Sequence, residues 1–369
     1  GLSGDKYIGQ SGSVVEANGA YCSAKSMSSW GLAAFRGLCP EEPTKRGGYY
    51  SGAVAYYGKT HDLNTVQGDQ KVTTYAVALA SPLPEIKMYL GTDRKLITLV
   101  PFGKTVGTAN SPWTYAPTNT IVDYYVEEIS ATHGNFQINF EDVEQGADHD
   151  MDALVTYEYW LVDGTGNEVS DPVNATQLKV TLTSTQASGS YIQHLGYIIS
   201  GTTKDGPYVE VCDADTSTSD DITSPYDTPP GYNTAPGTSS GLKLPKLATR
   251  YFTPGTGNST ASLVKNPLWY AGKWGGFEDE NANGLADQDS EWDKDLDGVP
   301  DNYFFVVNPL KLEEQLNKSF AAILNQASSG TALAVVSGSR TGEGAIYQAV
   351  FYPEQTDTSG KSISWTGQL

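Results

Sequence analysis

The chain of 369 residues lacks several features that define familiar classes of protein. It has no apolar run of the ~18–20 residues that a membrane-spanning helix needs, and Gly1 opens no basic and then apolar leader segment, which predicts a mature or cleaved fragment. Basic residues are few, with 23 Lys and Arg against 43 Asp and Glu and a net charge of −20. Because phosphate backbones and anionic lipid surfaces attract basic faces, we expect no nucleic-acid partner and no membrane insertion.

Motifs that identify common enzymes are also missing. We find no HExxH, P-loop or GxGxxG sequence. The four histidines, at 61, 133, 149 and 194, are scattered, and the carboxylates occur at metal-ligand spacing rather than as an isolated acid/base pair. We therefore predict that the chain is not an enzyme. A calcium-dependent hydrolase is an alternative, which would require a pocket with perturbed acid and base groups.

Cysteine is scarce, with only Cys22, Cys39 and Cys212. None forms a CxxC pair or a zinc-ligand spacing, so a metal–thiolate site is not expected. Cys22 and Cys39 would close a short loop, and we predict a disulfide between them. Three buried thiols are the alternative. The abundance of Tyr, Thr, Ser, Gly and Asn favours an exported protein.

The first 82 residues predict a helix followed by a strand. Apolar residues recur at helical spacing within residues 47–59, at Tyr50, Ala53, Val54 and Tyr57. The run from 72 to 79 is rich in β-branched residues and predicts a strand. A helix followed by a buried strand is typical of an α/β layer.

The middle of the chain predicts short strands. Separated by Gly, Asn, Asp and Pro, these runs span residues 96–100, 121–129, 136–140, 154–161 and 178–182. Several such strands in succession favour a β-sandwich. Residues 213–250 are polar and predict a long surface loop or linker.

A single amphipathic helix is predicted over residues 308–328. Asn308 is suited to cap it and Pro309 to occupy its first turn. A core-facing stripe is expected from five apolar residues, Leu312, Leu316, Phe320, Ile323 and Leu324. Strand-like runs follow at 333–336 and 346–352.

Carboxylates concentrate between residues 278 and 301, where ten Asp and Glu accompany one Lys. Two loops there repeat the same order fourteen residues apart, with oxygen ligands at positions 1, 3, 5 and 9, a backbone carbonyl at position 7 and Gly at position 6. The first loop offers Asp279, Asn281, Asn283, Leu285 and Asp287, and the second Asp293, Asp295, Asp297, Val299 and Asp301.

This pattern predicts calcium binding. Alternate residues of such a loop converge on one point, and a crowded cage of oxygen atoms suits Ca²⁺ better than Mg²⁺. Position 12 holds Ser290 or Phe304 instead of Glu, so the loops are not EF-hands. They resemble the DxDxDGxxD loops of thrombospondin type-3 and dockerin-like sequences. The alternative, a solvated acidic loop, does not account for a glycine at position 6 in both loops.

A further acidic cluster comprises Glu141, Asp142, Asp148, Asp150 and Asp152. The alternation of Asp148, Asp150 and Asp152 suggests a second cation site. The cluster lacks the glycine that a calcium loop needs, so an exposed turn is an equally good interpretation. His149 is expected to be a solvent-facing neighbour, because imidazole is a poor ligand for a hard cation.

Several segments resemble the type IV pilus tip-associated adhesin family (PilC/PilY-like). These segments are 37–40, 47–57, Asp62-Leu63, 139–142 with 148–152, 199–206, 267–277 and 300–320. The most distinctive is Pro-Leu-Trp-Tyr-Ala-Gly-Lys-Trp-Gly-Gly-Phe at 267–277, which leads directly into the acidic loops.

The resemblance implies an exported cell-surface protein with a von Willebrand A-like domain and a C-terminal β-propeller. No DxSxS motif is present in residues 1–82, so the chain is expected to hold only the latter part of the A-like domain and the start of the propeller. Further chain segments would complete both.

We therefore expect a mainly β fold with some α. The predicted regions are a partial von Willebrand A-like α/β part at 1–82, a β-sandwich-like domain with its linker at 83–250, the calcium loops and helix at 251–330, and the first propeller strands at 331–369. The resemblance implies partners among the minor and major pilins or other pilus components, a role in pilus biogenesis, adhesion and surface attachment, and an unknown surface ligand. A structural subunit of an extracellular filament or surface assembly is the competing function.

Overall fold

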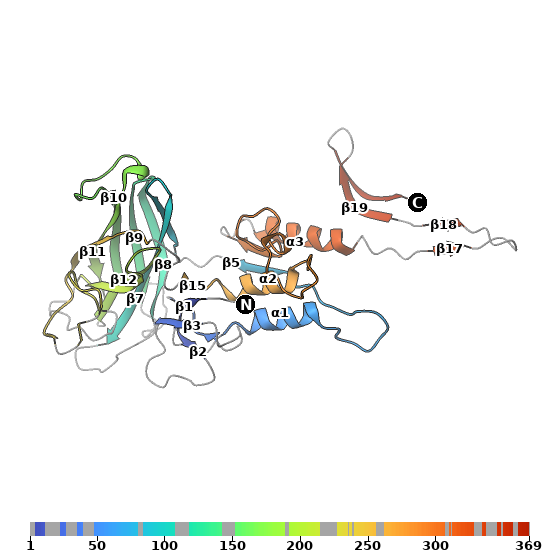
Figure 1. Cartoon of the computed structure of the whole chain (residues 1–369), viewed down its shortest axis with the longest axis horizontal. Helices are drawn as coiled ribbons and strands as arrows, with labels where there is room; N and C mark the ends of the chain where they lie inside the picture. Colours follow the sequence, from blue (N-terminus) through green and yellow to red (C-terminus); the bar gives the residue numbers. More distant parts are fainter. Residues whose placement is uncertain are drawn as a thin grey trace. The chain divides into compact units, whose positions relative to one another are not determined.

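The computed structural model describes most of the chain. The described residues are 4–11, 23–26, 35–39, 48–79, 84–107, 118–141, 152–188, 192–214, 227–234, 236–237, 240–255, 262–306, 310, 312–327, 334–336, 345–347, 350–356 and 361–368. Strands dominate and helices are few, which confirms the expected mainly β fold (Figure 1). None of the helices in these ranges has the length and apolarity to span a bilayer.

The chain divides into two compact units. Unit 1 comprises Gly1–Ala53 and Ser81–Tyr270, and unit 2 comprises Val54–Ala80 and Ala271–Leu369. The helix and strand expected in the first 82 residues therefore contribute mainly to unit 2. The predicted domain boundaries, the von Willebrand A-like part and the propeller start stay predictions.

Unit 1 holds the larger set of strands. Its elements are β1 (Asp5–Ile8), β2 (Gln10–Ser11), β3 (Ser23–Ser26), β4 (Phe35–Arg36), β6 (Ile86–Leu90), β7 (Lys95–Gly107), β8 (Thr118–Ile129), β9 (His133–Glu141), β10 (Ala153–Val162), β11 (Gln177–Ala187), β12 (Ile192–Ser200), β13 (Gly206–Cys212), β14 (Leu247–Phe252) and β15 (Ser262–Leu263). All five strands predicted between residues 96 and 182 are present, and each is longer than expected.

Most of these strands form one continuous path in the order β13-β12-β7-β8-β9-β10-β11-β14, with β6 beside β7. Two layers, β6-β7-β12-β13 and β8-β9-β10-β11-β14, are joined where Gly103 and Lys104 of β7 pair with β8. Side chains from both layers share one buried core. The Tyr157 hydroxyl also crosses between the layers to donate to the Gly196 carbonyl at 2.7 Å. The fold therefore has the two-layer arrangement expected of a sandwich.

A second apolar cluster in unit 1 gathers Tyr7, Phe102, Ile198, Val209 and Leu244 around two cysteines. Cys39 is disulfide-bonded. Cys212 is buried, and its thiol donates to the Leu244 carbonyl at 3.4 Å. Cys22 lies outside the described residues, so its pairing with Cys39 stays a prediction.

The segment expected to be a linker, residues 213–250, contributes to this core. Its last residues begin β14, which pairs with β11 from Leu178–Phe252 to Thr183–Leu247. The side chain of Arg250 in β14 is buried against Glu210 of β13, with Nε 2.8 Å from Oε1. Its Nη2 donates to the Thr228 carbonyl at 2.8 Å. The described end of the segment is therefore tied into the sandwich.

Burial perturbs the groups of this ion pair in opposite directions. Burial raises the pKa of Glu210 above its ordinary value, although the charge of Arg250 lowers it. Burial lowers the pKa of Arg250, but the charge of Glu210 and its hydrogen bond outweigh that effect and raise it overall. The carboxylate thus carries a desolvation cost that the guanidinium only partly offsets.

Unit 2 combines short strands with helices. Its elements are most of α1 (Tyr50–Thr60), β5 (Ala76–Leu79), most of α2 (Pro267–Gly276), β16 (Tyr303–Val306), α3 (Leu312–Ala327), β17 (Ala334–Val336), β18 (Ala345–Tyr347), β19 (Val350–Thr356) and β20 (Ser362–Gln368). Strands β5 and β16 pair in parallel from Ala76–Tyr303 to Leu79–Val306. The hairpins β17–β18 and β19–β20 are antiparallel.

The helix predicted at residues 47–59 is confirmed as α1, but the large side chains of its predicted apolar stripe do not form the packed face. Tyr50, Val54 and Tyr57 are exposed, whereas Ala55 is buried. A Cβ added to Gly275 of α2 would lie only 2.8 Å from the Ala55 Cβ. Small residues on both helices therefore allow close approach, while Tyr50, Val54 and Tyr57 stay exposed.

The predicted helix at 308–328 is present as α3, which begins at Leu312; Asn308 and Pro309 lie outside the described residues. Its expected core-facing stripe is only partly correct. Leu312 and Leu316 are half-buried, but Phe320 is exposed and its neighbour Ser319 is buried. The Ser319 hydroxyl donates to the Leu316 carbonyl at 2.7 Å, so this polar side chain is satisfied within the helix.

Candidate metal centre

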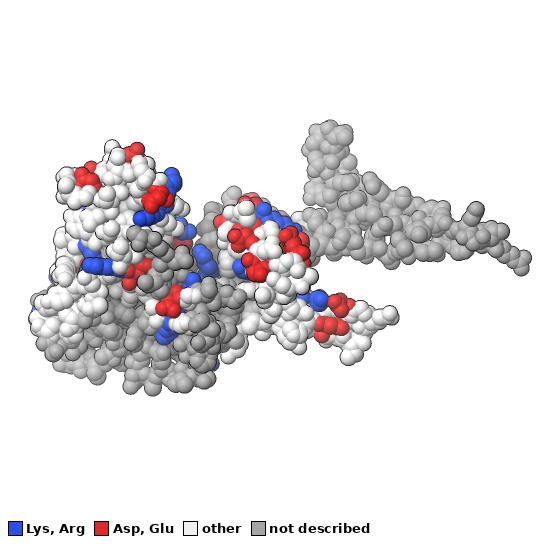
Figure 2. All heavy atoms as spheres, viewed as in Figure 1, with Lys and Arg blue, Asp and Glu red and all other residues white. Residues whose placement is uncertain are grey.

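The two acidic loops lie in unit 2, between α2 and β16, where exposed carboxylates gather on the surface (Figure 2). Asp279 and Asp293 occupy position 1 of the first and second loop. Each accepts backbone hydrogen bonds from positions 5 and 6, at 3.0 and 2.8 Å in the first loop and at 3.0 and 2.7 Å in the second. The position 5 side chain accepts from the N–H of position 7 at 2.7 Å in both loops.

The backbone turns in the same way in both loops. Position 4 is left-handed, with φ of 57° at Ala282 and 59° at Leu296, and so is position 6, with φ of 75° at Gly284 and 83° at Gly298. Only one other non-glycine residue in the described part of the chain has a positive φ. Since such a conformation is unfavourable for Ala and Leu, its recurrence at the same position indicates one loop fold used twice.

The second loop brings its ligands together. One carboxylate oxygen from each of Asp293, Asp295 and Asp297 lies within 4.8 Å of the other two. Asp293 is buried, while the other two are exposed. Three like charges at this separation repel one another, and a divalent cation between them would relieve that repulsion. The donor set therefore fits a hard cation.

Asp301, at position 9 of the second loop, is adjacent to this group in sequence but is not part of it. Burial raises its pKa, and the charges of Asp295 and Asp293 add to the rise, against the effect of Lys294. Its backbone N–H donates to the Trp292 carbonyl at 2.9 Å. The backbone at Asp301 is therefore fixed at the end of the loop.

Amide groups occupy the first loop. Asn281 and Asn283 donate from their side-chain nitrogens to the two oxygens of Asp287, at 3.0 and 2.9 Å. These hydrogen bonds lower the pKa of Asp287. The predicted ligands at positions 3, 5 and 9 thus face one another across the loop. With two carboxylates among its side-chain ligands instead of four, the first loop should attract a cation less strongly than the second.

Glu291 was not predicted from the sequence, yet it organises the first loop. Its buried carboxylate accepts backbone hydrogen bonds from Glu280 at 3.1 Å, Asp287 at 3.0 Å and Gln288 at 3.1 Å. These bonds join the two sides of the loop. A local signal existed, because Gln288 and Glu291 have the spacing of a capping box.

Other residues of unit 2 contact the first loop at Gly284 and the chain directly after the second loop. The Tyr56 hydroxyl of α1 donates to the Gly284 carbonyl at 2.9 Å, and its ring packs edge-on against Trp274, with the centroids 5.6 Å apart. Asn302 follows the second loop, and its side chain donates to the Thr74 carbonyl at 3.1 Å. The loops are therefore anchored on α1 and on the β5–β16 pair.

The second acidic cluster is only partly described. Glu141 ends β9 and Asp152 precedes β10, and both side chains are buried. Asp142, Asp148 and Asp150 lie outside the described residues, as does His149. A cation site there stays a prediction.

Two family models match the chain. One, described as the β-sandwich of PilY1 homologues, covers residues 90–248, and another, described as the second domain of PilY1 homologues, covers residues 1–58. The first coincides with most of the two-layer fold of unit 1. No solved structure matches the chain.

A curated relative extends this relationship. The type IV pilus biogenesis factor PilY1 homologue of Xylella fastidiosa (strain Temecula1) is 40% identical over 377 aligned residues, which cover 92% of this chain and 23% of that protein. Over most of its length, the chain is therefore similar to PilY1 homologues, and two of their domains are matched. The resemblance found in the sequence is thereby confirmed. The chain spans about a quarter of the length of the relative.

Proposed function

We propose that the chain is a segment of a cell-surface, calcium-binding protein that acts with type IV pili in pilus biogenesis, adhesion and surface attachment. The observation that carries the pilus role is the 40% identity to the Xylella factor across 92% of the chain. Partners would be minor or major pilins or other pilus components, together with further segments of a longer protein. We propose a non-enzymatic role, located outside the cell or at its surface.

The calcium part of the proposal is supported by the repeated loop geometry. Asp279 and Asp293 each fold the backbone of their loop around one carboxylate. Three carboxylates of the second loop approach within 4.8 Å. Asp293, Asp295, Asp297 and Asp301 would hold one ion with the Val299 carbonyl. The corresponding residues of the first loop would hold another.

Calcium would stabilise the connection between α2 and β16 within unit 2. The loops carry most of the charge in this connection, and the ion would neutralise carboxylates that otherwise repel each other. A ligand that binds only the folded state stabilises it by about 2.7 kcal/mol per site at a concentration one hundred times its Kd. The purified chain should therefore melt at a higher temperature in calcium than in chelator, and magnesium should have a smaller effect. Equal melting temperatures in calcium and chelator would refute calcium binding.

The pilus role needs a separate test in cells. Immunogold electron microscopy of the native, full-length protein on piliated cells should show isolated label at pilus tips. Label repeating along a filament would favour the competing function, a structural subunit of an extracellular filament. Label unrelated to pili would refute the proposed function and leave calcium binding to be judged by melting alone.

A further inference from the structure

Strand β8 has a long open edge in the sandwich of unit 1. Its contact with β7 is limited to the pairs Gly103–Asn119 and Lys104–Thr118, whereas β9 follows it from Thr120 to Ile129. Among the described strands, none pairs with residues 123–129 on the side away from β9. We call residues 123–129 the β8 edge. In an antiparallel strand, about half of the backbone N–H and C=O groups point to such an open side.

The β8 edge is exposed on both faces of its sheet. None of its seven residues is buried, although β9 beside it alternates buried and half-buried residues. The large apolar side chains of the edge are 41% exposed at Tyr124, 66% at Tyr125, 39% at Val126 and 66% at Ile129. One face of a strand in an antiparallel sheet normally packs on the core, whereas neither face of the β8 edge is covered.

Part of this apolar surface belongs to the core-facing side. Tyr124 and Val126 pair with Ile138 and Phe136, which are both buried in the core. Residues directly opposite in a ladder share a face, so Tyr124 and Val126 extend the core face to the rim of the sheet. An added strand with apolar residues at alternate positions would continue that face and cover them.

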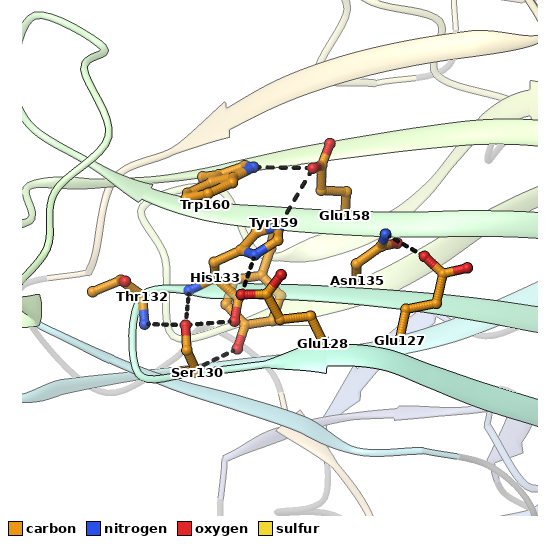
Figure 3. Close-up of polar contacts among 9 residues, drawn as sticks. All are labelled: Glu127, Glu128, Ser130, Thr132, His133, Asn135, Glu158, Tyr159 and Trp160. Carbon is orange, nitrogen blue, oxygen red and sulfur yellow. Dashed lines mark hydrogen bonds and ion pairs between the residues drawn. The ribbon is translucent and has the colours of Figure 1, made fainter.

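The other groups on the β8 edge are acidic. Strand β8 contains Asp123, Glu127 and Glu128 and no Lys or Arg. Glu127 accepts a hydrogen bond from the Asn135 side-chain nitrogen at 2.7 Å. The Nδ1 atom of His133 lies 3.4 Å from the Glu128 carboxylate, and its Nε2 atom lies 3.4 Å from the Glu158 carboxylate (Figure 3). Asn135 is neutral, and β10, on the far side of β9 from β8, adds the charge of Glu158.

We propose that the β8 edge binds an extended segment of another protein by strand addition, and that this segment alternates apolar and basic residues. Backbone hydrogen bonds would give affinity, apolar residues would cover Tyr124 and Val126, and Lys or Arg would face the carboxylates. A second copy of this chain fits poorly, because pairing β8 with itself would place both sets of carboxylates on one ribbon. This inference is independent of the calcium loops.

Binding can be measured by fluorescence anisotropy with the full chain and a nine-residue peptide that alternates valine and lysine. One control peptide carries glutamate in place of lysine, and the other keeps the lysines but carries N-methyl groups on alternate backbone nitrogens. The lysine peptide should bind at least about tenfold more tightly than either control, and it should slow hydrogen exchange within residues 123–129. Equal binding of the N-methylated peptide would indicate charge attraction without strand addition and would overturn the proposal.

Two double variants, each with two added lysines, locate the site. Asp123→Lys with Ile129→Lys should weaken binding of the lysine peptide by at least about tenfold. Leu247→Lys with Tyr251→Lys, two exposed positions on the terminal strand β14, should leave it unchanged. Equal effects of both pairs would overturn the proposal. So would sedimentation showing a dimer that the β8 pair dissociates, because the occupant would then be a second copy.

Discussion

We predict that breaking the buried Arg250–Glu210 ion pair strongly destabilises unit 1. Replacing Arg250 with Met removes the 2.8 Å ion pair and leaves the buried Glu210 without its counter-charge. It also removes the donor to the Thr228 carbonyl. Breaking a buried pair in this way typically costs about 3–5 kcal/mol. For a unit of this size, the melting temperature should fall by about 6–20 °C.

The assay is urea unfolding of the full chain, followed by tryptophan fluorescence and circular dichroism. The control is Lys87→Met, which removes an exposed pair with Glu85 of 3.1 Å and should cost less than about 1 kcal/mol. Changing Arg250 and Glu210 together to Met should recover much of the loss, because no buried charge remains. The reasoning fails if Arg250→Met is as mild as the control.

Three further results are expected. Burial raises the pKa of Glu210, so the folded state binds an extra proton at pH values between the ordinary and the raised pKa. The free energy of unfolding should therefore fall as the pH rises through that window. Glu210→Gln should remove this dependence in urea titrations from about pH 4 to 7. Gly196→Ala should destabilise by about 3 kcal/mol or more, since its Cβ would lie 1.9 Å from the Tyr208 backbone oxygen, whereas Gly164→Ala, with a nearest atom at 3.7 Å, should be mild in thermal melts. If Cys39 pairs as expected, thiol titration of the denatured chain should give one thiol per chain before reduction, and three would refute the pairing.

The sandwich was predictable where its strands alternate. In β10, buried and half-buried residues alternate along most of the strand, and this period-2 pattern is visible in the sequence. The loops were also predictable, because Asp or Asn at positions 1, 3 and 5 with Gly at 6 dictates the turn. The left-handed backbone at Ala282 and Leu296 was not predicted, since neither residue type favours it.

Other features depend on partners that are distant in the sequence. The pairing of Arg250 with Glu210 leaves no local pattern. Of the three backbone hydrogen bonds that Glu291 accepts, only the one from Gln288 has a local signal, the capping-box spacing. In α1 the periodicity identified a helix but not its packed face, because close contact at Ala55 depends on Gly275 in another helix. Periodicity locates apolar side chains, and only tertiary contacts decide which of them are covered.

Calorimetric titration of the chain with calcium tests the central proposal most directly. We predict two ions per chain, with tighter binding at the second loop and dissociation constants in the range of about 10⁻⁴–10⁻³ M that is typical of extracellular calcium modules. Asp295→Asn should weaken one ion by about tenfold. Asp289→Asn, an exposed carboxylate of the same segment that is not a predicted ligand, should bind as the parent does. No calcium binding, or equal binding by the two variants, would contradict the account.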